Sequence, residues 1–366
     1  MARKLKSDRV LFLTTLVLAA AGVVMVYSAS TALAMGEHGQ SNLLTKQALL
    51  AAVGLAAMFA AMRVDYQRYR DPRVVLSVVG FTLVALVAVL IVGPTINGAK
   101  WWFSVGGSGI QPSELAKVAM ILFTAAVLVR RMDRIDEPAY ALGPIVVVLV
   151  PVLGLIMLQP DLGSSLAVLA IVAAMVFAAG LPHRHVIRAG LIIVPLAAIA
   201  AIMEPYRLVR LMVFWNPWED RFGRGFQTVQ SLIAVGTGGV TGRGLGYSVQ
   251  KLFYLPYPHT DFIYAVVAEE LGLVGASLML ACFCIMTWRG LRTAAHAPDA
   301  FGSFLALGLT TMITVQAFVN ISVVLGLLPT KGIPLPFISA GGSSLIMSLA
   351  GMGVLLNISQ RASTET

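Results

Sequence analysis

The sequence predicts an all-α polytopic membrane protein, a bundle of ten transmembrane helices with both termini in the cytoplasm. The chain has 366 residues, of which 58% are hydrophobic and only 12% are charged, and its mean hydropathy is +0.85. An average soluble domain is about 25% charged, and a disordered chain is poor in apolar residues. The apolar residues form continuous runs, whereas a membrane barrel needs strands of about ten residues with strict alternation.

Ten apolar segments are long enough to cross the bilayer, because about 30 Å of hydrocarbon takes roughly 20 helical residues. They cover residues 10–34, 46–63, 74–93, 113–129, 141–158, 163–180, 186–203, 262–287, 302–328 and 342–358. The first apolar run, from Val10 to Val26, is longer than the core of a cleaved signal peptide, so we expect it to be retained as a span. Residues 1–366 are thus predicted to form a single membrane domain.

Basic residues alternate between the two sides of these spans. If the N-terminus is cytoplasmic, sixteen of the 26 Lys and Arg residues fall on cytoplasmic segments: Arg3, Lys4, Lys6, Arg9, Arg63, Arg68, Arg70, Arg73, Arg130, Arg131, Arg134, Arg184, Arg188, Arg289, Arg292 and Arg361. The short loops on the other side hold few, with Lys46, Lys100 and Lys331 at or near them. This positive-inside pattern explains most of the net charge of +9 without a nucleic acid partner.

One segment on the outer side departs from this pattern. Residues 204–261 form a predicted loop of 58 residues that carries Arg207, Arg210, Arg221, Arg224, Arg243 and Lys251. Long translocated loops escape the charge rule, so a solvated loop is one interpretation. We favour the other, a surface that binds an anion such as phosphate, because loops of this length are usually functional. Its glycines between Gly236 and Gly246 indicate close-packed backbone, since the strand and helix of a dinucleotide-binding motif are absent.

The motif QPSELAK at residues 111–117 begins a helix at the outer face. Ser113 is predicted to be the N-cap, and Glu114 in the first turn suits the positive end of the helix. Glu114 and Lys117 are three residues apart and therefore share one face. Two roles stay open for the pair: an ion pair that only secures the helix start, or a cavity in which Lys117 binds a phosphate or carboxylate.

Further acidic residues lie where spans meet the outer face. Asp161, in the short turn QPDLG, has a helix cap as its simplest role. Asp261, in HTDF, lies where the long loop enters the eighth span, and partial desolvation there would raise its pKa and make it a better base. Glu269 and Glu270 lie deeper in the same span, so we expect at least one of them to pair with a buried base or to be protonated.

The residues alone thus predict an outward-facing polar site for an anionic, lipid-linked substrate. Its members are Glu114, Lys117, Asp161 and Asp261, next to the basic loop. The sequence has no Ser-His-Asp arrangement, zinc spacing or Walker motif. Whether the site moves its substrate or reacts with it stays open at this point.

At these motifs the sequence resembles the SEDS family (shape, elongation, division and sporulation) of bacterial cell-wall proteins, which includes FtsW and RodA. The similar stretches span nearly the whole chain and cover residues 97–100, 111–117, 159–163, 214–220, 227–275 and 328–339. The motifs WNPWED, GLGxSxQK and LPTKG are more similar to the FtsW branch than to RodA. The resemblance implies a SEDS-type bundle in the bacterial cytoplasmic (inner) membrane.

The resemblance also implies a function, a peptidoglycan glycosyltransferase that polymerises lipid II at the outer face of the membrane for cell division or elongation. It implies that Asp261 is catalytic, that Glu114 and Lys117 line the same cavity and that Asp161 supports it. The other candidates for binding substrate are Arg207, Arg210, Lys251 and His259. The expected partners are lipid II, membrane lipids and a single-pass class B penicillin-binding protein, with a divalent cation, Mg²⁺ or Mn²⁺, as a candidate cofactor.

Two other functions compete with this one, a lipid II flippase and a scaffold that only recruits a transpeptidase. The polar site at the outer boundary and the lack of an internal repeat favour an enzyme over a transporter, and a scaffold has no need for buried charged residues at one site. The sequence departs from the family's patterns at Trp101, Tyr257 and Ala340, where an Arg, an acid and a Tyr are common. A role of that acid in cation binding or loop anchoring therefore cannot be carried over.

Overall fold

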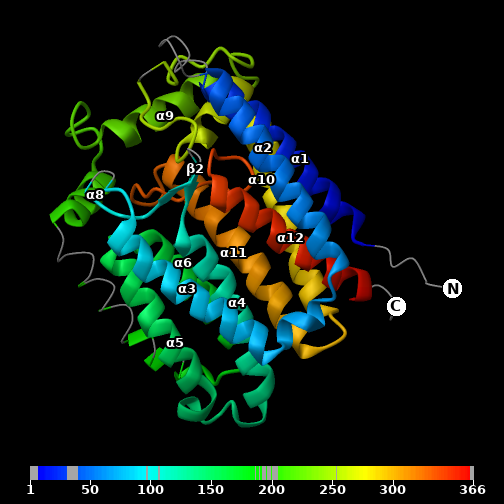
Figure 1. The fold of residues 1–366 in the computed structure, drawn as a ribbon. Coiled ribbons are helices and arrows are strands. Elements are labelled where there is room, and N and C mark those ends of the chain that lie inside the picture. The colour runs from blue at the N-terminus through cyan, green and yellow to red at the C-terminus, as the bar shows by residue number, and fades with distance from the viewer. Residues whose placement is uncertain are drawn as a thin grey trace.

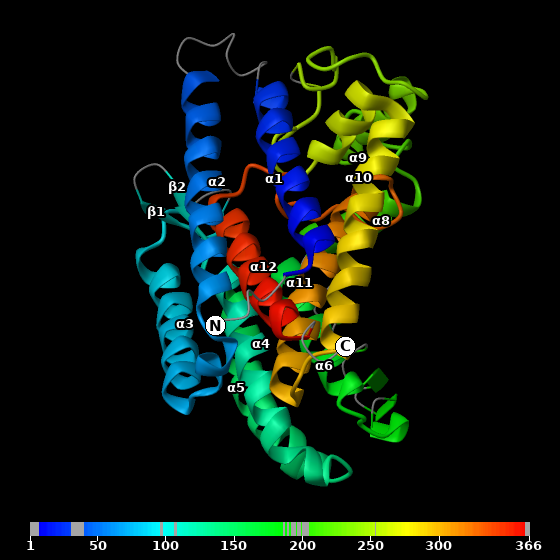
Figure 2. The same ribbon diagram turned by 90° about the vertical axis from the view of Figure 1, so that its right-hand side faces the viewer.

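The computed structural model describes residues 7–30, 40–95, 98–105, 108–185, 205–252 and 254–362, with isolated residues between 186 and 199. Its long helices lie side by side in one bundle (Figures 1 and 2). Eight of them are long and apolar enough to cross a membrane. They are α1 (Arg9–Ser30), α2 (Gln40–Arg63), α3 (Pro72–Val92), α4 (Pro112–Arg131), α5 (Pro138–Leu158), α10 (Ile263–Ala295), α11 (Ala300–Val324) and α12 (Gly342–Ala362).

A further apolar helix, α6 (Leu162–Ala178), has 17 residues and matches the predicted span at 163–180. The predicted span at 186–203 lies largely outside the described residues. The other nine predicted spans all correspond to apolar helices. The chain is therefore a multi-pass, all-α membrane protein, as the hydropathy predicted.

The helices differ in how much of their surface the bundle covers. In α4 and α12, 78% and 72% of the most apolar window is buried, compared with 28% in α3 and α5. The central helices α4, α11 and α12 therefore form the core (Figure 1). The peripheral helices expose large apolar side chains such as Phe81 and Ile91. In a bilayer these side chains face lipid, where their exposure carries no hydrophobic cost.

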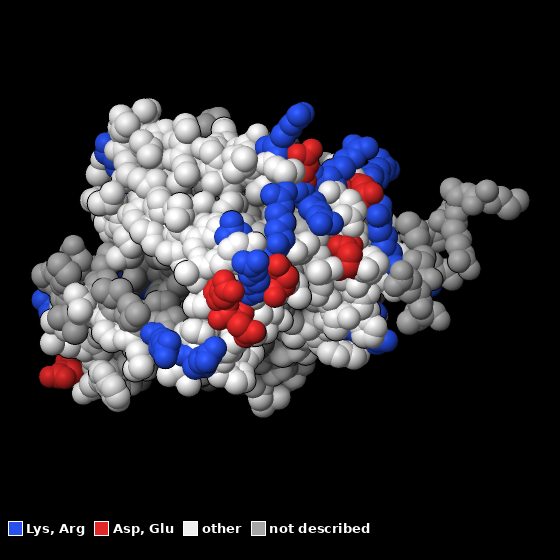
Figure 3. Space-filling view, turned by 90° about the horizontal axis from the view of Figure 1, so that it is seen from below, with Lys and Arg blue, Asp and Glu red and all other residues white. Residues whose placement is uncertain are grey.

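The start of α1 and the end of α12 lie at the same end of the bundle. The Asp8 amide donates to Ser359 Oγ at 3.2 Å, and Arg289 Nε donates to Asp8 Oδ2 at 2.6 Å. This arrangement agrees with an even number of crossings. Seen from below the bundle, Lys and Arg side chains gather among a few acidic ones (Figure 3), as the positive-inside pattern predicts for a cytoplasmic face.

The 204–261 segment is more ordered than the predicted loop. It contains α8 (Pro205–Trp215) and α9 (Phe226–Gly238). A two-stranded antiparallel hairpin, β1 (Phe103–Val105) and β2 (Ser108–Ile110), is a second element that the sequence did not indicate. These elements are too short to span a membrane, so long apolar runs in the sequence do not indicate them.

The predicted span at 262–287 corresponds to α10, which is interrupted at Gly272 by a non-helical backbone, φ 66° and ψ −166°. The 239–244 segment fills the interruption. The amides of Leu273 and Val274 donate to the carbonyls of Gly239 and Val240 at 2.9 and 3.2 Å. In the other direction, the amides of 243 and 244 donate to the carbonyls of 269 and 270 at 3.0 and 2.9 Å. The break thus leaves these backbone groups satisfied, which a membrane environment requires.

Glycine is needed where the loop meets α10. A Cβ atom on Gly238 would lie 2.0 Å from the Ala268 carbonyl oxygen, and one on Gly242 would lie 2.2 Å from the Glu270 carbonyl oxygen. Real Cβ atoms do not approach backbone this closely, so a side chain at either position would push the loop away. The glycine-rich stretch is therefore close-packed backbone, as the sequence predicted.

Candidate active site at the outer end of the bundle

Asp261 lies two residues before α10, and backbone hydrogen bonds fix its position. Asn320 on α11 donates through Nδ2 to the Asp261 carbonyl at 2.8 Å. Ser339 donates through Oγ to the Thr260 carbonyl at 2.6 Å, and the Ala340 amide donates to the His259 carbonyl at 2.9 Å. The HTDF motif is therefore held against α11 and against the segment that precedes α12.

The segment around Gly332 packs directly against the Asp261 carboxylate. A Cβ atom on Gly332 would lie 2.9 Å from Asp261 Oδ2. Asn320 Nδ2 also donates to the Ile333 carbonyl at 2.7 Å, so a single amide group ties Asp261 to this segment. The positioning roles of Asn320 and Ser339 were not predicted from the sequence. A buried Asn within an apolar span is itself a signal that could have identified Asn320.

The electrostatic environment of Asp261 combines burial with one nearby positive charge. Burial raises the pKa of Asp261 to about 6, although the positive charge of Arg210 lowers it. Arg210, on α8, donates through Nη1 to the Thr330 carbonyl at 2.8 Å. Arg210 is thus connected to the same segment that contacts Asp261. The side chain of Arg207, one turn earlier, lies outside the described residues.

A cavity of about 580 Å³ lies beside Arg210. It is lined by Val209, Arg210, Gly223, Arg224, Phe226, Gln227, Pro256 and Thr330. Two arginines from different elements therefore face one space, with an aromatic and two aliphatic side chains beside them. Asp220 fixes the turn that carries Arg224, since its Oδ2 accepts the Arg224 amide at 2.9 Å. The cavity suits an anionic group attached to a larger molecule.

Glu114 and Lys117 form a buried ion pair inside α4, with Lys117 Nζ 2.7 Å from Glu114 Oε1. No hydrogen bond or ion pair joins either residue to Asp261 in the part of the chain that is described. The prediction that Ser113 is the N-cap is wrong, because α4 begins at Pro112 and Gln111 takes the cap position. The early start leaves Ser113 inside the first turn, where its hydroxyl lies 3.3 Å from Ser164 Oγ.

Asp161 caps α6, accepting the Ser164 amide at 2.9 Å, which is the simplest role that the sequence suggested. Its other oxygen accepts Gln111 Nε2 at 3.1 Å. Next to it, a Cβ atom on Gly163 would lie 3.1 Å from the Ile333 side chain. The 332–333 segment therefore contacts the Asp161 turn through Ile333 and Asp261 through Gly332.

Lys251, a candidate for binding substrate, lies away from Asp261 and pairs with Glu270. It is buried, and its Nζ lies 2.7 Å from Glu270 Oε1 and 3.1 Å from Ser28 Oγ. The long loop folds back onto α10, which carries this lysine inward to a carboxylate that has no other cation among the described residues. The prediction that Glu269 or Glu270 pairs with a buried base is confirmed.

His259 lies two residues before Asp261 and is partly buried. Burial lowers the pKa of His259, so its imidazole is neutral at physiological pH. Its Nδ1 atom is buried and has no hydrogen-bond partner among the residues described. An unpaired ring nitrogen at this position is available to a substrate hydroxyl, and substrate binding by His259 stays a prediction.

Trp101, Tyr257 and Ala340, the three residues that depart from the family's patterns, lie in different environments. Trp101 donates through Nε1 to the Gln159 carbonyl and so joins the hairpin region to the Asp161 turn. Tyr257 is half-exposed and has a positive φ of 55°. Ala340 contributes its backbone amide to the hydrogen bond with His259.

A divalent cation finds few protein ligands at this site. No group of three or more His, Cys, Asp or Glu side chains that could hold a metal occurs among the described residues. A carboxylate with an arginine beside it is a poor fit for a second positive charge. The described residues therefore do not fit a protein-held cation.

Comparison with known proteins agrees with this architecture. The family described as cell cycle protein (FtsW, RodA, SpoVE) matches residues 8–364. The chain is 44% identical over 359 residues to stage V sporulation protein E of Bacillus subtilis, covering 98% of each. It is 42% identical over 355 residues to the probable peptidoglycan glycosyltransferase FtsW of Geobacter metallireducens, covering 97% of this chain and 95% of that protein.

Solved structures give the same result. One solved structure concerns the structural coordination of polymerization and crosslinking by a peptidoglycan synthase complex. A chain of that structure matches this one with a TM-score of 0.80 and 33% identity, over 98% of this chain and 99% of that one. The rod shape determining protein RodA of Thermus thermophilus has a TM-score of 0.72 and 30% identity, covering 97% of each chain. By sequence match and by fold, the chain belongs to the FtsW, RodA and SpoVE family of cell cycle proteins.

Proposed function

We propose that this protein is a peptidoglycan glycosyltransferase that polymerises lipid II into glycan strands at the outer face of the cytoplasmic membrane. The observation that carries the proposal is the Asp261 carboxylate, whose pKa is raised to about 6 and which feels the charge of Arg210. Arg210 in turn lines a cavity together with Arg224. A general base works best when its pKa lies near the operating pH. The names of relatives at 42% identity agree with this activity.

In the proposed reaction, Asp261 takes the proton from the 4-hydroxyl of the incoming sugar. The resulting oxygen attacks the anomeric carbon of the growing chain and inverts its configuration. The bond to the diphosphate breaks, and undecaprenyl diphosphate leaves with the electron pair. Arg210 and Arg224 line one cavity, and their charges offset that of this leaving group. Lys117 is paired with Glu114 at 2.7 Å, and substrate binding by Lys117 stays a prediction.

A flippase would use the polar groups of a broken helix to bind the lipid that it transports. In transporters, the free backbone groups at such a break bind the substrate. Here the 239–244 segment occupies the backbone groups on both sides of Gly272. These backbone groups are therefore not free to bind a transported substrate, which favours the transferase over the flippase.

The solved relative that belongs to a peptidoglycan synthase complex suggests a partner. We infer that a class B penicillin-binding protein cross-links the strands that this protein makes. A polymerase and a transpeptidase act on the same strand in succession, so a complex keeps the new strand close to both. Co-purification of the two proteins from detergent-solubilised membranes tests the partnership.

The catalytic assignment is tested with Asp261→Asn, measured as glycan ladders made from labelled lipid II by protein purified with its partner. We expect at least a 100-fold loss of polymerisation with an unchanged melting temperature, because general bases contribute about 10²–10⁴-fold. Asp136→Asn is the matched control, since Asp136 is exposed on the opposite side of the spans. Wild-type ladders from Asp261→Asn would exclude Asp261 as the base.

A further inference from the structure

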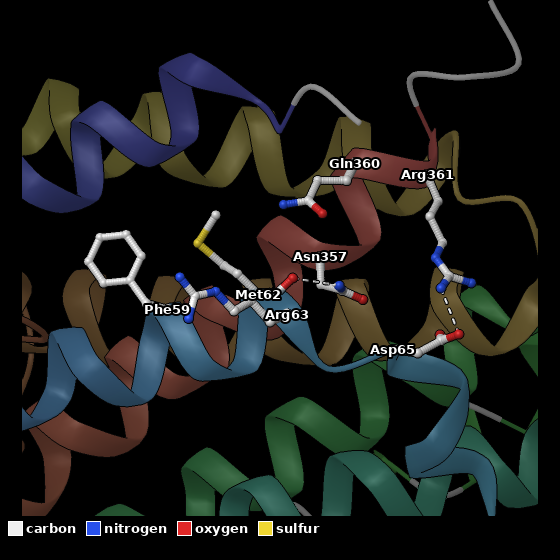
Figure 4. A pocket seen from close by; sticks show the side chains of 7 residues that line it. All are labelled: Phe59, Met62, Arg63, Asp65, Asn357, Gln360 and Arg361. Carbon is white, nitrogen blue, oxygen red and sulfur yellow. Dashed lines mark hydrogen bonds and ion pairs between the residues drawn. The ribbon is translucent and has the colours of Figure 1, made fainter. Parts of the chain in front are cut away.

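We propose that the pocket between the ends of α2 and α12 binds the headgroup of an anionic phospholipid from the cytoplasmic leaflet. The pocket has a volume of about 390 Å³ and is lined by Phe59, Met62, Arg63, Asp65, Asn357, Gln360 and Arg361 (Figure 4). It lies at the end of the bundle where α1 begins and α12 ends, and its residues are distant from Asp261 in the sequence. The site is independent of the proposed catalytic reaction.

The floor of the pocket is rigid because one amide side chain connects its two helices. Asn357 of α12 donates through Nδ2 to the Met62 carbonyl, the last turn of α2, at 2.8 Å. The same side chain accepts the Tyr66 amide at 3.1 Å. Asn357 therefore satisfies backbone groups where α2 ends and the 3₁₀ helix η2 (Tyr66–Arg70) begins. The space between the helices is thus built into the fold.

The two arginines of the pocket differ in their partners. Arg361 lies 2.6 Å from Asp65 and over the Tyr66 ring, so its charge is balanced. Arg63 is the last residue of α2 and is exposed, and its guanidinium makes no hydrogen bond or ion pair with any described residue. In Figure 4 its side chain runs back along α2 toward Phe59, while Arg361 turns toward Asp65. The pocket therefore has one unbalanced positive charge.

The position of Arg63 indicates which anion balances that charge. The apolar span of α2 ends at Arg63, and Phe59, one turn earlier, is 44% exposed on the lipid-facing side of the bundle. An arginine directed toward such a side chain lies at the depth where hydrocarbon meets headgroups, and anionic lipid headgroups attract a positive charge there. A phospholipid supplies both a phosphate for Arg63 and an acyl chain for Phe59 and Met62.

The test measures the melting temperature of detergent-purified protein during titration with phosphatidylglycerol, phosphatidylcholine or inorganic phosphate. We expect phosphatidylglycerol to stabilise the wild type, and Arg63→Gln to need about fivefold more lipid, because a basic residue near an anionic surface contributes about 1 kcal/mol. Arg73→Gln is the control, since Arg73 is exposed and lies outside the pocket. Phosphatidylcholine and inorganic phosphate should give no difference between the variants.

Two outcomes would overturn the proposal. One is the same phosphatidylglycerol dependence for Arg63→Gln and the wild type, and the other is equal stabilisation by inorganic phosphate, which would assign the charge to a free anion. A second variant keeps the test valid if Arg63→Gln does not fold. Phe59→Trp, at an exposed aromatic position, should add fluorescence that phosphatidylglycerol with brominated chains quenches more than brominated phosphatidylcholine does.

Discussion

The acidic residues just before α10 and in its outer part have two contrasting environments. Asp261 forms no salt bridge within the described chain, and its carboxylate lies against Gly332. Glu269 and Glu270, only eight and nine residues later, are fully buried. Glu270 is bound by Lys251 and Ser28, and Glu269 accepts bonds from Ser248 Oγ and the amides of 249 and 250 at 2.5–3.2 Å.

This contrast separates a reactive carboxylate from structural ones. A carboxylate whose oxygens already accept several hydrogen bonds has little capacity left to accept a proton from a substrate. A carboxylate that is desolvated and short of donors holds its proton more tightly and is a better base. The paired glutamates anchor the segment from Ser248 to Lys251, which leads to Asp261. The structural pair thus supports the position of the reactive residue without sharing its chemistry.

The largest expected effect on stability comes from breaking the buried pair. Glu270→Gln leaves the Lys251 ammonium buried without a counter-charge, and removing one partner of a buried ion pair costs about 3–5 kcal/mol. We expect a strongly lowered melting temperature in detergent. Glu137→Gln, at an exposed position without a side-chain cap bond, should change it little. Equal melting temperatures for the two variants would show that the Lys251 pair is not structural.

The next largest effect on stability is expected from a substitution at Gly242, which packs against the break in α10. Gly242 has a φ of +80°, and a Cβ atom there would lie 2.2 Å from the Glu270 carbonyl oxygen. Gly242→Ala should therefore destabilise the protein by about 1–3 kcal/mol, the cost of such backbone strain. Gly236→Ala is the control, because Gly236 lies within α9 and has no atom within 4 Å of the Cβ position. That control should be neutral or slightly stabilising, and a similar loss from both would contradict the tight fit at Gly242.

How far the sequence predicts these features depends on how local their causes are. Spans depend on runs of neighbouring residues, so hydropathy predicted them, and the ion pair of Glu114 with Lys117 follows from a spacing of three. The break at Gly272 depends on the 239–244 segment, about 30 residues away, which supplies its hydrogen bonds. The buried position of Lys251 could not be predicted because its partners, Glu270 and Ser28, are 19 and 223 residues away.

The site shows the same division. The motif HTDF identified Asp261 because a carboxylate at a span boundary is recognisable by position alone. The residues that hold it, Asn320 and Ser339, are 59 and 79 residues from their acceptors. Arg224 was noted only as one basic residue of a long loop, and its place beside Arg210 depends on how α8 and α9 pack. Contacts between distant segments therefore account for most of what the sequence did not predict.

A smaller effect is expected on the pH dependence of polymerisation. Asp261 must be ionised to act as a base, so kcat/KM should rise with pH through about 6. Arg210 lowers the pKa of Asp261. Arg210→Gln should therefore move the acidic limb of the profile to higher pH, in addition to any loss of substrate binding. An acidic limb at the same pH in both proteins would show that Asp261 is not the titrating base.

The smallest effect on stability should come from removing Arg243, the basic residue that pairs with Glu269. Arg243 Nη1 lies 3.6 Å from Glu269 Oε1, and the arginine side chain is 41% exposed. Exposed ion pairs contribute less than about 1 kcal/mol, and Glu269 keeps its three other donors when Arg243 is removed. Arg243→Gln should lower the melting temperature by a small amount that disappears in high salt, because salt screens exposed charges. The effect of Glu270→Gln should persist in the same salt. A salt-independent loss in Arg243→Gln would show that the exposure of this cation does not limit what its ion pair contributes.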